Sequence, residues 1–429
     1  MNKLILTLVA FAAISSASAA TISQTVVRQL WPWSTKVDVG FVLAGEPDED
    51  CDVKLAISDA NGPINVYANS LSGELSNLKP GEHHVVWDPT ISGVTGLEAL
   101  SALKFTVTAQ TSLGKKYMVI DISEGASDDA TYAVSYLDEA PDGTFATSEY
   151  RLNKIVLRRI PAGTFLMGSP ETETGHVADE AQVRVVLTND YYMGVFPVSM
   201  HQYTNVYAAA QSVVESKANW YKKRPEGPAA YLLWTDVAGA SATIPTLATV
   251  EGTSFLGLMR SKVKSGLPAG YHISLPSEAQ WEYACRAGTT TAWNNGVDCN
   301  VTGSNGQDTN ADQLGLTGNF NNSAGYGGSN GFTKNLGSFL PNAWGLYDCH
   351  GYVSEFTRGG KLTRTDSTAV FVEPDGSSSQ YIVTRGGSCT QKTTACRSAS
   401  VYTFYIPRTN IEMGFGFRLA VVPVPATAQ

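Results

Sequence analysis

The stretch from Thr289 to Phe339 is rich in Gly and Asn and shows no hydrophobic periodicity. Loop regions of this length are uncommon inside a compact domain. Where they occur, they are binding loops, disordered lids, or loops fixed by metal ions or disulfides. The 40 glycines of the chain also favour turns over long helices. We therefore expect loops to dominate this part of the chain.

The residues between Thr21 and about Ala146 predict short β-strands instead. Turn residues separate segments that alternate between apolar and polar residues or are rich in β-branched ones. Several short strands at even spacing predict an all-β antiparallel sandwich over residues 21–120. The segments are VDVGFVL (37–43), DVKLAIS (52–58), HHVVWD (83–88) and LKFTVTAQ (103–110).

The phrase GEHHVVWD, residues 81–88, resembles a bacterial Ig-like module of the type found in cell-surface proteins. Its adjacent histidines, His83 and His84, point to opposite faces of a strand and lack a third ligand, so we expect structural roles for them. Residues 121–154 follow and contain many Asp, Glu, Ser and Gly. They predict a connector with a strand or two, YAVSYL among them.

The first residues of the chain have the parts of a secretory signal peptide. Basic Lys3 precedes an apolar run, LILTLVAFAAI, that is too short for a stable membrane span. The small residues Ala17-Ser18-Ala19 then fit a cleavage site. We expect residues 1–20 to be removed and the mature chain to be exported to the periplasm, the cell surface or the medium. No later segment is long and apolar enough to cross a bilayer.

The charge of the chain restricts its partners. It has 30 basic and 39 acidic residues, a net charge of -9, and no long basic stripe. A phosphate backbone is repelled by such a chain on balance, so nucleic acid is a poor partner. The cysteines and histidines show no C-x-x-C or H-x-x-x-H spacing, which argues against structural zinc.

From Ile155 onwards the sequence predicts strands and a few short helices. Ser199 is the predicted N-cap of a helix that starts near Met200. The segment SFLGLMRSKVKSG (254–266) has the pattern of an amphipathic helix. Ser277 and Gln280 form a capping-box pattern for a helix that runs to Cys285.

Five phrases in this half of the chain occur in one characteristic order. Together they resemble the formylglycine-generating enzyme family, also called sulfatase-modifying factors, over residues 155–422. The resemblance implies an α+β fold of the C-type-lectin-like kind with little regular secondary structure. The phrases are IPAGTFLMGSP (160–170), YYMGVFPVSMHQY (191–203), LPSEAQWEYACRAGT (275–289), PNAWGLYDCHGYVSEF (341–356) and RGGS…CRSAS…GFGFRLA (385–420).

The resemblance also implies a catalytic site. Active family members oxidise a sulfatase cysteine to formylglycine with two cysteines that bind copper(I), Cu+, and that follow the Gly-Gly-Ser phrase with four residues between them. Soft, exposed thiolates suit that ion. Here Ser388 matches the serine, whereas Cys389 and Cys396 have six residues between them. We expect these cysteines to be catalytic only if the loop brings their sulfurs together, and to be structural otherwise.

Disulfides are the default for six cysteines in an exported protein, and 15 connectivities are open to them. In many bacterial relatives a cysteine of the WEYACRAG helix accompanies one before RSA, which implies a Cys285–Cys396 disulfide here. That bridge closes a loop of about 110 residues and contributes roughly 4 kcal/mol in the chain-entropy model. A Cys349–Cys389 bridge is a second expectation.

The resemblance further implies a calcium ion, Ca2+, near the phrase that reads GYVSEF here. Calcium takes six to eight oxygen ligands, and Glu355 would supply a carboxylate beside the Tyr352 and Val353 carbonyls. Asp312 with Asn330 in the long loop is another candidate pair. The alternative is that Glu355 caps a turn or pairs with Arg358.

The segment from Cys389 to Phe415 departs most from the usual family text while its framing phrases are kept. Tyr402, Phe404 and Tyr405 are large, rigid side chains suited to ligand contact, and the alternative is that they are core residues. Some family members are variable receptors of diversity-generating retroelements, whose variation falls between such framing phrases.

Three functions follow from these observations. The first is an exported, non-catalytic binding module that holds a protein, peptide or glycan ligand at the cell surface. The second is a formylglycine-generating oxidase that acts on sulfatase cysteines, and the third is a structural envelope component. A retroelement-diversified receptor is a special case of the first.

Overall fold

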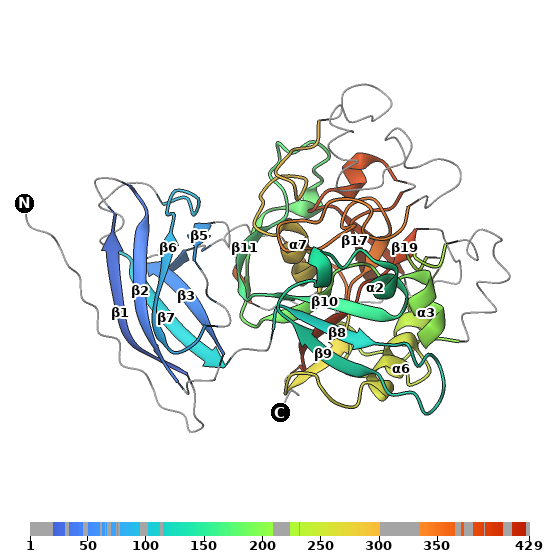
Figure 1. Ribbon diagram of the computed structural model, residues 1–429. Coiled ribbons are helices and arrows are strands. Elements are labelled where there is room, and N and C mark those ends of the chain that lie inside the picture. Colours follow the sequence, from blue (N-terminus) through green and yellow to red (C-terminus); the bar gives the residue numbers. More distant parts are fainter. Residues whose placement is uncertain are drawn as a thin grey trace, which may run out of the picture. The chain divides into compact units, whose positions relative to one another are not determined.

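The computed structural model describes residues 20–425 except for 31–33, 46–49, 61, 65, 67–69, 74, 76–77, 95–101, 112–114, 209–223, 231, 301–333, 365–369, 373–380, 390 and 406–413. The predicted signal peptide therefore lies almost wholly outside the described residues. The chain divides into two compact units, Met1–Lys115 with Ala162–Phe165, and Lys116–Pro161 with Leu166–Gln429 (Figure 1).

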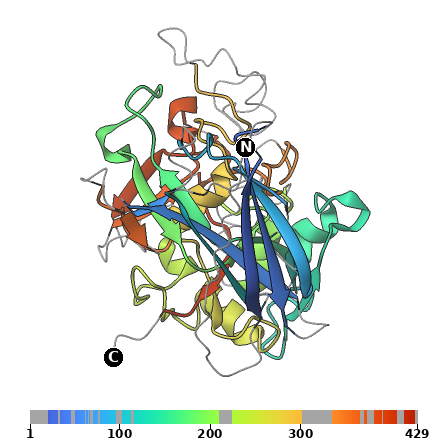
Figure 2. The ribbon, with the colours of Figure 1, turned by 90° about the vertical axis from the view of Figure 1, so that its left-hand side faces the viewer.

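The first unit is all-β and holds two antiparallel sheets, ordered β1-β2-β6-β5 and β4-β3-β7. Figure 2 shows its long strands in blue to cyan. All four segments expected as strands in this region are strands. The bounds are β1 (Thr21–Gln29), β2 (Val37–Ala44), β3 (Cys51–Asp59), β4 (Gly62–Ile64), β5 (Leu71–Ser72), β6 (Gly81–Trp87) and β7 (Lys104–Thr111).

Alternate residues of the two sheets form one core in the first unit. Val39 of β2, Val53 of β3 and Trp87 of β6 belong to a single hydrophobic cluster. Trp87 is fully buried, its ring meets Phe105 edge-on, and its indole N–H donates to the Ser92 hydroxyl at 3.0 Å. This satisfied polar group lets a large aromatic residue occupy the centre of the sandwich.

The second unit is α+β and is built around a six-stranded sheet ordered β14-β20-β13-β10-β8-β9. Its strand pairs are antiparallel. The sheet brings together strands from both ends of the unit. Their bounds are β8 (Tyr117–Asp121), β9 (Ala133–Leu137), β10 (Lys154–Ile160), β13 (Tyr191–Gly194), β14 (Tyr271–Ser274) and β20 (Ala420–Pro423).

Residues 121–154 are part of this unit and not a connector between units, although the strand expected at YAVSYL is present as β9 (Ala133–Leu137). They carry β9, the short helix α2 (Ser148–Leu152) and the start of β10. In Figure 1, β8, β9 and β10 lie side by side. The acidic composition that favoured a connector belongs to the turns between these elements.

Two small sheets and short helices complete the second unit. The sheets are ordered β11-β12-β16 and β18-β17-β15-β19. Their strands are β11 (Gly163–Met167), β12 (Val183–Leu187), β15 (Ser354–Phe356), β16 (Val370–Val372), β17 (Tyr381–Arg385), β18 (Val401–Tyr405) and β19 (Phe415–Gly416). The helices are α3 (Met200–Val206), α5 (Trp234–Val237), α6 (Phe255–Lys262), α7 (Glu278–Arg286) and the 3-10 turns η2 (Pro141–Gly143), η3 (Ala178–Glu180) and η5 (Thr393–Cys396).

The predicted helix caps are confirmed. Ser199 and Ser277 each accept from the backbone N–H three residues on, and Gln202 and Gln280 reach back to the cap N–H groups. These reciprocal bonds satisfy two backbone donors at each helix start. Among the helices of the described residues, none has the length and apolar character that a membrane crossing needs.

Candidate functional site

The Gly-Gly turn after β17 sets the position of the candidate catalytic residues. Gly386 and Gly387 have φ values of +85° and +65°. A Cβ on Gly386 would lie 2.7 Å from the Cys349 carbonyl, and a Cβ on Gly387 would lie 2.6 Å from the Cys396 sulfur. Only glycine fits both the left-handed backbone and these close approaches. The turn therefore packs the segment after β17 directly against two cysteines.

Buried ion pairs fix β17 against α7. The Arg385 guanidinium donates to Glu278 at 3.0 Å and to Glu282 at 2.7 Å, and all three side chains are almost fully buried. Burial by itself raises the pKa of Glu282, but the guanidinium groups of Arg286 and Arg385 hold it down at about 2. Glu282 is thus a fixed anion that positions the strand leading into the Gly-Gly turn.

Ser388, Cys389 and Cys396 are buried, with exposed fractions of 4%, 2% and 0%. The Cys396 thiol donates to the Lys392 carbonyl at 3.5 Å and the Ser388 carbonyl at 3.9 Å. Burial raises the pKa of Cys389 to about 12. Burial, and then the neighbouring Cys389, raises the pKa of Cys396 as well. The two thiols are therefore neighbours that stay protonated at neutral pH.

This arrangement does not suit copper(I). A cuprous ion binds thiolates, and a thiol whose pKa is strongly raised by burial gives up its proton at a large cost. Neither sulfur of the pair, Cys389 or Cys396, presents an exposed thiolate in the structure. The donor set present here does not fit the ion that the family resemblance implies.

The cysteines that lie next to each other in the structure are not the pairs that were expected to form disulfides. No disulfide links Cys285, Cys349, Cys389 and Cys396 to one another in the structure. In the structure the Cys285 thiol lies against Cys349 while Cys396 packs with Cys299, so the expected Cys285–Cys396 bridge stays a prediction. The Cys349 thiol donates to the Tyr347 carbonyl at 3.7 Å, and the expected Cys349–Cys389 bridge also stays a prediction.

Glu355 is the centre of a buried ion pair. Both of its carboxylate oxygens accept from the Arg418 guanidinium at 2.6 Å, and one also accepts from the Trp281 indole N–H at 2.7 Å. The partner is thus Arg418, not Arg358. With its oxygens held in this way, the carboxylate does not fit a calcium site beside Tyr352 and Val353.

Other metal ligands are not brought together in the part of the chain that the structure describes. No group of three His, Cys, Asp or Glu side chains there has a metal-holding arrangement. The candidate pair Asp312 and Asn330 lies in 301–333, outside the described residues. His83 stacks on Phe41, and His84 pairs with Asp38 at 3.0 Å, in line with the structural roles expected for them.

The aromatic segment forms β18, an outer strand of its sheet. Tyr402 is 44% exposed, and its ring lies 6.0 Å from that of Phe415. Phe415 stacks on Phe356, which meets Trp234 edge-on. A row of rings therefore leads from the surface into the core. The backbones of Phe404 and Tyr405 pair with β17, and their side chains lie outside the description.

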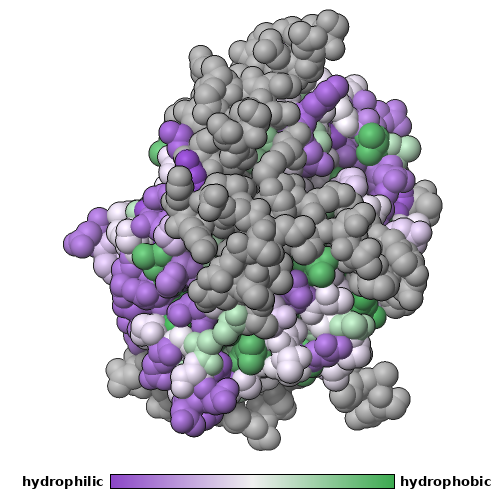
Figure 3. Space-filling model, turned by 90° about the vertical axis from the view of Figure 1, so that its right-hand side faces the viewer, coloured by the Kyte–Doolittle hydropathy of each residue, from purple (hydrophilic) through white to green (hydrophobic). Residues whose placement is uncertain are grey.

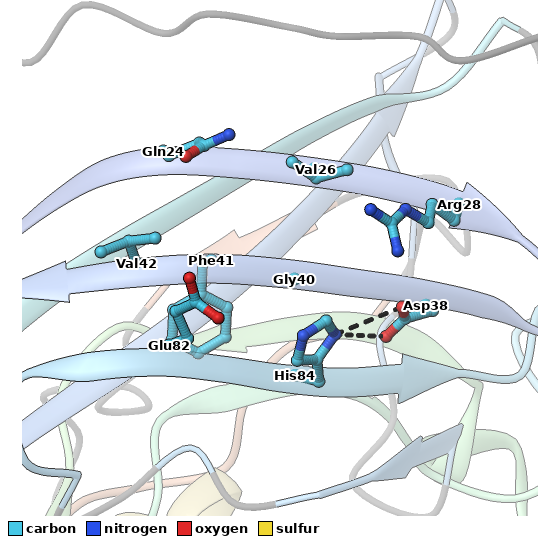
Figure 4. Close-up of a pocket in the computed structure, with 9 residues that line it drawn as sticks. All are labelled: Gln24, Val26, Arg28, Asp38, Gly40, Phe41, Val42, Glu82 and His84. Carbon is cyan, nitrogen blue, oxygen red and sulfur yellow. Dashed lines mark hydrogen bonds and ion pairs between the residues drawn. The ribbon is translucent and has the colours of Figure 1, made fainter.

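The first unit has a shallow hollow of about 160 Å³ on the outer face of β1, β2 and β6. The His84 ring packs over Gly40, where there is no room for a side chain, because a Cβ on Gly40 would lie 2.8 Å from the ring. Figure 4 shows His84 joined to Asp38 beside this gap. The lining residues are Gln24, Val26, Arg28, Asp38, Gly40, Phe41, Val42, Glu82 and His84.

Sequence reasoning missed two buried polar groups next to the Gly-Gly turn. His350 donates from Nδ1 to the Cys396 carbonyl at 2.8 Å, and burial lowers its pKa to about 4. Burial raises the pKa of Asp348 to about 7. Both belong to the phrase LYDCHG. Its succession of an acid, a thiol and an imidazole is the sequence pattern that could have indicated them.

The fold and site define an α+β domain in which the five sequence phrases contribute to a buried core of ion pairs and thiols. The family described as "Sulfatase-modifying factor enzyme 1-like domain" matches residues 143–422, and the chain belongs to this family. The mouse formylglycine-generating enzyme is 27% identical over 292 residues, which are 62% of this chain and 74% of that protein.

Solved structures also resemble the chain at low sequence identity. PvdO from Pseudomonas aeruginosa is 20% identical with a TM-score of 0.42, and the match covers 62% of this chain and 94% of that one. Treponema denticola variable protein 1 is 20% identical with a TM-score of 0.45, covering 63% and 96%. A structure of CarF has a TM-score of 0.37 at 17% identity, covering 63% and 99%.

Proposed function

We propose that this chain is an exported, non-catalytic binding module built on the sulfatase-modifying-factor fold. The observation that carries the proposal is the burial of Cys389 and Cys396, 2% and 0% exposed, with thiols that remain protonated at neutral pH. A substrate thiol must reach its oxidant, and reactive cysteines occur in accessible, electropositive environments. The buried pair is not accessible, and burial outweighs the neighbouring Arg397 guanidinium, which lowers the pKa of Cys396.

The proposed ligand contact is the surface at Tyr402. Its ring is half-exposed at the edge of a sheet and is backed by Phe415 and Phe356, so little conformational entropy is lost when a ligand covers it. On the face shown in Figure 3, described hydrophobic residues form small separate patches among hydrophilic ones. A protein, peptide or glycan that stacks on a single rigid ring suits the half-exposed Tyr402 side chain.

The catalytic part of the proposal is tested with a peptide substrate. The reduced, copper-loaded protein is incubated with a peptide that contains Cys-x-Pro-x-Arg, and the aldehyde product is measured by mass spectrometry. We expect no aldehyde above the level of a Cys389→Ser variant. Turnover by the unaltered protein that disappears in Cys389→Ser would overturn the proposal.

The binding part is tested with two tyrosine variants. The full chain is screened against a glycan array and a displayed peptide library, and the strongest hits are titrated. Tyr402→Ala should weaken binding at least about tenfold, as expected when an aromatic anchor is lost. Tyr381→Ala is the matched control, since Tyr381 is 53% exposed on the neighbouring strand. Equal affinity for both variants and the unaltered protein would exclude Tyr402 as a contact.

A formylglycine-generating oxidase is the second candidate. It is favoured by the likeness to the mouse formylglycine-generating enzyme and by the electrostatic proximity of Cys389 to Cys396. The peptide assay above separates it from the binding module. Export, a Ca2+ ion at the second candidate pair, Asp312 and Asn330, and retroelement-driven variation remain proposals that N-terminal sequencing, metal analysis and genomic context would test.

A further inference from the structure

The C-terminal end of α7 is attached to the segment 342–350. The Asn342 amide N–H₂ donates to the carbonyls of Ala284 and Cys285 at 2.8 and 3.0 Å, which satisfies two of the carbonyls that a helix end leaves without intrahelical partners. The side-chain oxygen of Asn342 accepts from the N–H groups of Trp344 and Leu346. One asparagine thus fixes this segment against the backbone of Cys285.

The same attachment brings two thiols together. The thiols of Cys285 and Cys349 are electrostatic neighbours, because Cys349 acts on the titration of Cys285, and both side chains are buried. The Cys285 sulfur also lies 3.7 Å from His350 Nε2, on the residue that follows Cys349. A Cβ on Gly386 would touch both the Cys349 carbonyl and the Trp281 ring, one helical turn before Cys285. Separate contacts therefore place Cys349 against the last turn of α7.

The imidazole beside the pair has a defined orientation. His350 Nδ1 lies 2.8 Å from the Cys396 carbonyl, which can only accept a hydrogen bond, and this assigns the N–H to Nδ1. Nε2 then accepts from the Asn294 N–H at 3.3 Å and faces the Cys285 thiol. With the ring held in this way, Cys349 is the sulfur neighbour of Cys285 that the described structure provides for covalent pairing.

We propose that Cys285 and Cys349 form a disulfide when the chain folds in an oxidising compartment. The two thiols lose two protons and two electrons as the S–S bond forms. The electrons pass by thiol–disulfide exchange to an external disulfide, such as glutathione disulfide, which is reduced to two thiols. The bridge joins α7 covalently to the segment that carries Asp348 and His350.

Burial determines when the bond forms. A thiolate is the attacking species in exchange, and burial raises the pKa of Cys285 well above its usual value. The folded pair is therefore slow to react with external reagents. The bridge forms while α7 and the segment 342–350 are still accessible, and it is shielded from reductants afterwards.

Disulfide mapping of the full chain tests this proposal without any substitution. The protein is expressed with export to a bacterial periplasm, denatured in guanidinium with N-ethylmaleimide to block thiols, and digested without reduction. We expect a linked peptide pair that contains Cys285 and Cys349 and separates on reduction. Recovery of both cysteines as maleimide adducts, or of either joined to another cysteine, would overturn the proposal.

Two serine variants sharpen the result. In Cys349→Ser, Cys285 should appear as a maleimide adduct, an increase of about one blocked thiol per chain. Cys389→Ser is the matched control, because Cys389 is equally buried in the same unit but is not part of the pair. It should leave the Cys285–Cys349 peptide unchanged. A new Cys285–Cys396 link in the unaltered protein would instead favour the pairing implied by bacterial relatives.

Discussion

Asp348 is an acid held in an environment that disfavours its charge. It is 2% exposed, one oxygen accepts from the Gly337 N–H at 2.6 Å, and the other has no hydrogen-bond partner in the described structure. Burial, and to a smaller extent the charge of Glu355, raises its pKa from 3.8 to about 7, although the Gly337 bond and Arg418 oppose the shift. Removing a carboxylate from water without a compensating cation has this effect.

This shift predicts how stability changes with pH. Because the folded pKa exceeds the unfolded one, the native state binds more protons between about pH 4 and pH 7. The contribution of Asp348 is therefore present in full below pH 4 and is lost as the pH rises through 7. Asp348→Asn removes this dependence, and the amide tolerates the residue's φ of 58°.

We expect Asp348→Asn to raise the free energy of unfolding by roughly 2–4 kcal/mol at about pH 8 and by less than about 1 kcal/mol at about pH 4. Urea denaturation at a series of pH values measures the difference between the two proteins. The other titrating groups contribute equally to both proteins, so their effect cancels in that difference. Parallel stability profiles for both proteins would contradict the assignment.

At the scale of elements, α7 depends on its first turn. The Ser277 hydroxyl accepts from the Gln280 N–H at 3.2 Å, and the Gln280 side-chain oxygen accepts in turn from the Ser277 N–H at 2.9 Å. All nine residues of the helix are buried, so water cannot replace a lost cap. The helix also carries the two carboxylates, Glu278 and Glu282, that hold Arg385.

Ser277→Ala should therefore lower the free energy of unfolding by about 1–2 kcal/mol, the upper part of the range for N-cap removal. Ser254→Ala at the start of α6 is the matched control. Ser254 is also buried and accepts from the Gly257 N–H at 3.2 Å, but it has no reciprocal side-chain bond. Guanidinium unfolding should show a smaller loss of unfolding free energy for Ser254→Ala than for Ser277→Ala. Equal losses would show that the reciprocal bond of the capping box adds no stability.

These elements also show what the sequence could predict. Local sequence patterns were enough to predict α7, because its capping residues are three positions apart. They were also enough for β2, β3, β6 and β7, because the residue pattern of a strand is local as well. The pairing of β9 with β8 could not be predicted, because the acidic residues of the turn between them are typical of a connector and do not indicate which strand β9 pairs with. The contact of Cys285 with Cys349 depends on Asn342, whose role only the folded chain defines.

At the scale of the whole molecule, each unit has its own hydrophobic core. Trp87 lies in the cluster of the first unit, whereas Trp281 of α7 lies in the second and donates to Glu355. Both rings are fully buried. Since most stabilising contacts are internal to a unit, damage to one core should remain in that unit.

Trp87→Ala and Trp281→Ala form a reciprocal pair of variants for this prediction. Each should lower the stability of its own unit by about 3–5 kcal/mol, the usual cost of removing a buried aromatic ring. Limited proteolysis followed by mass spectrometry locates the damage. Cleavage of Trp87→Ala should fall within residues 20–115 and spare the second unit, and cleavage of Trp281→Ala should show the opposite pattern. If either variant were cleaved throughout the chain at the same rate, the two units would be one cooperative structure.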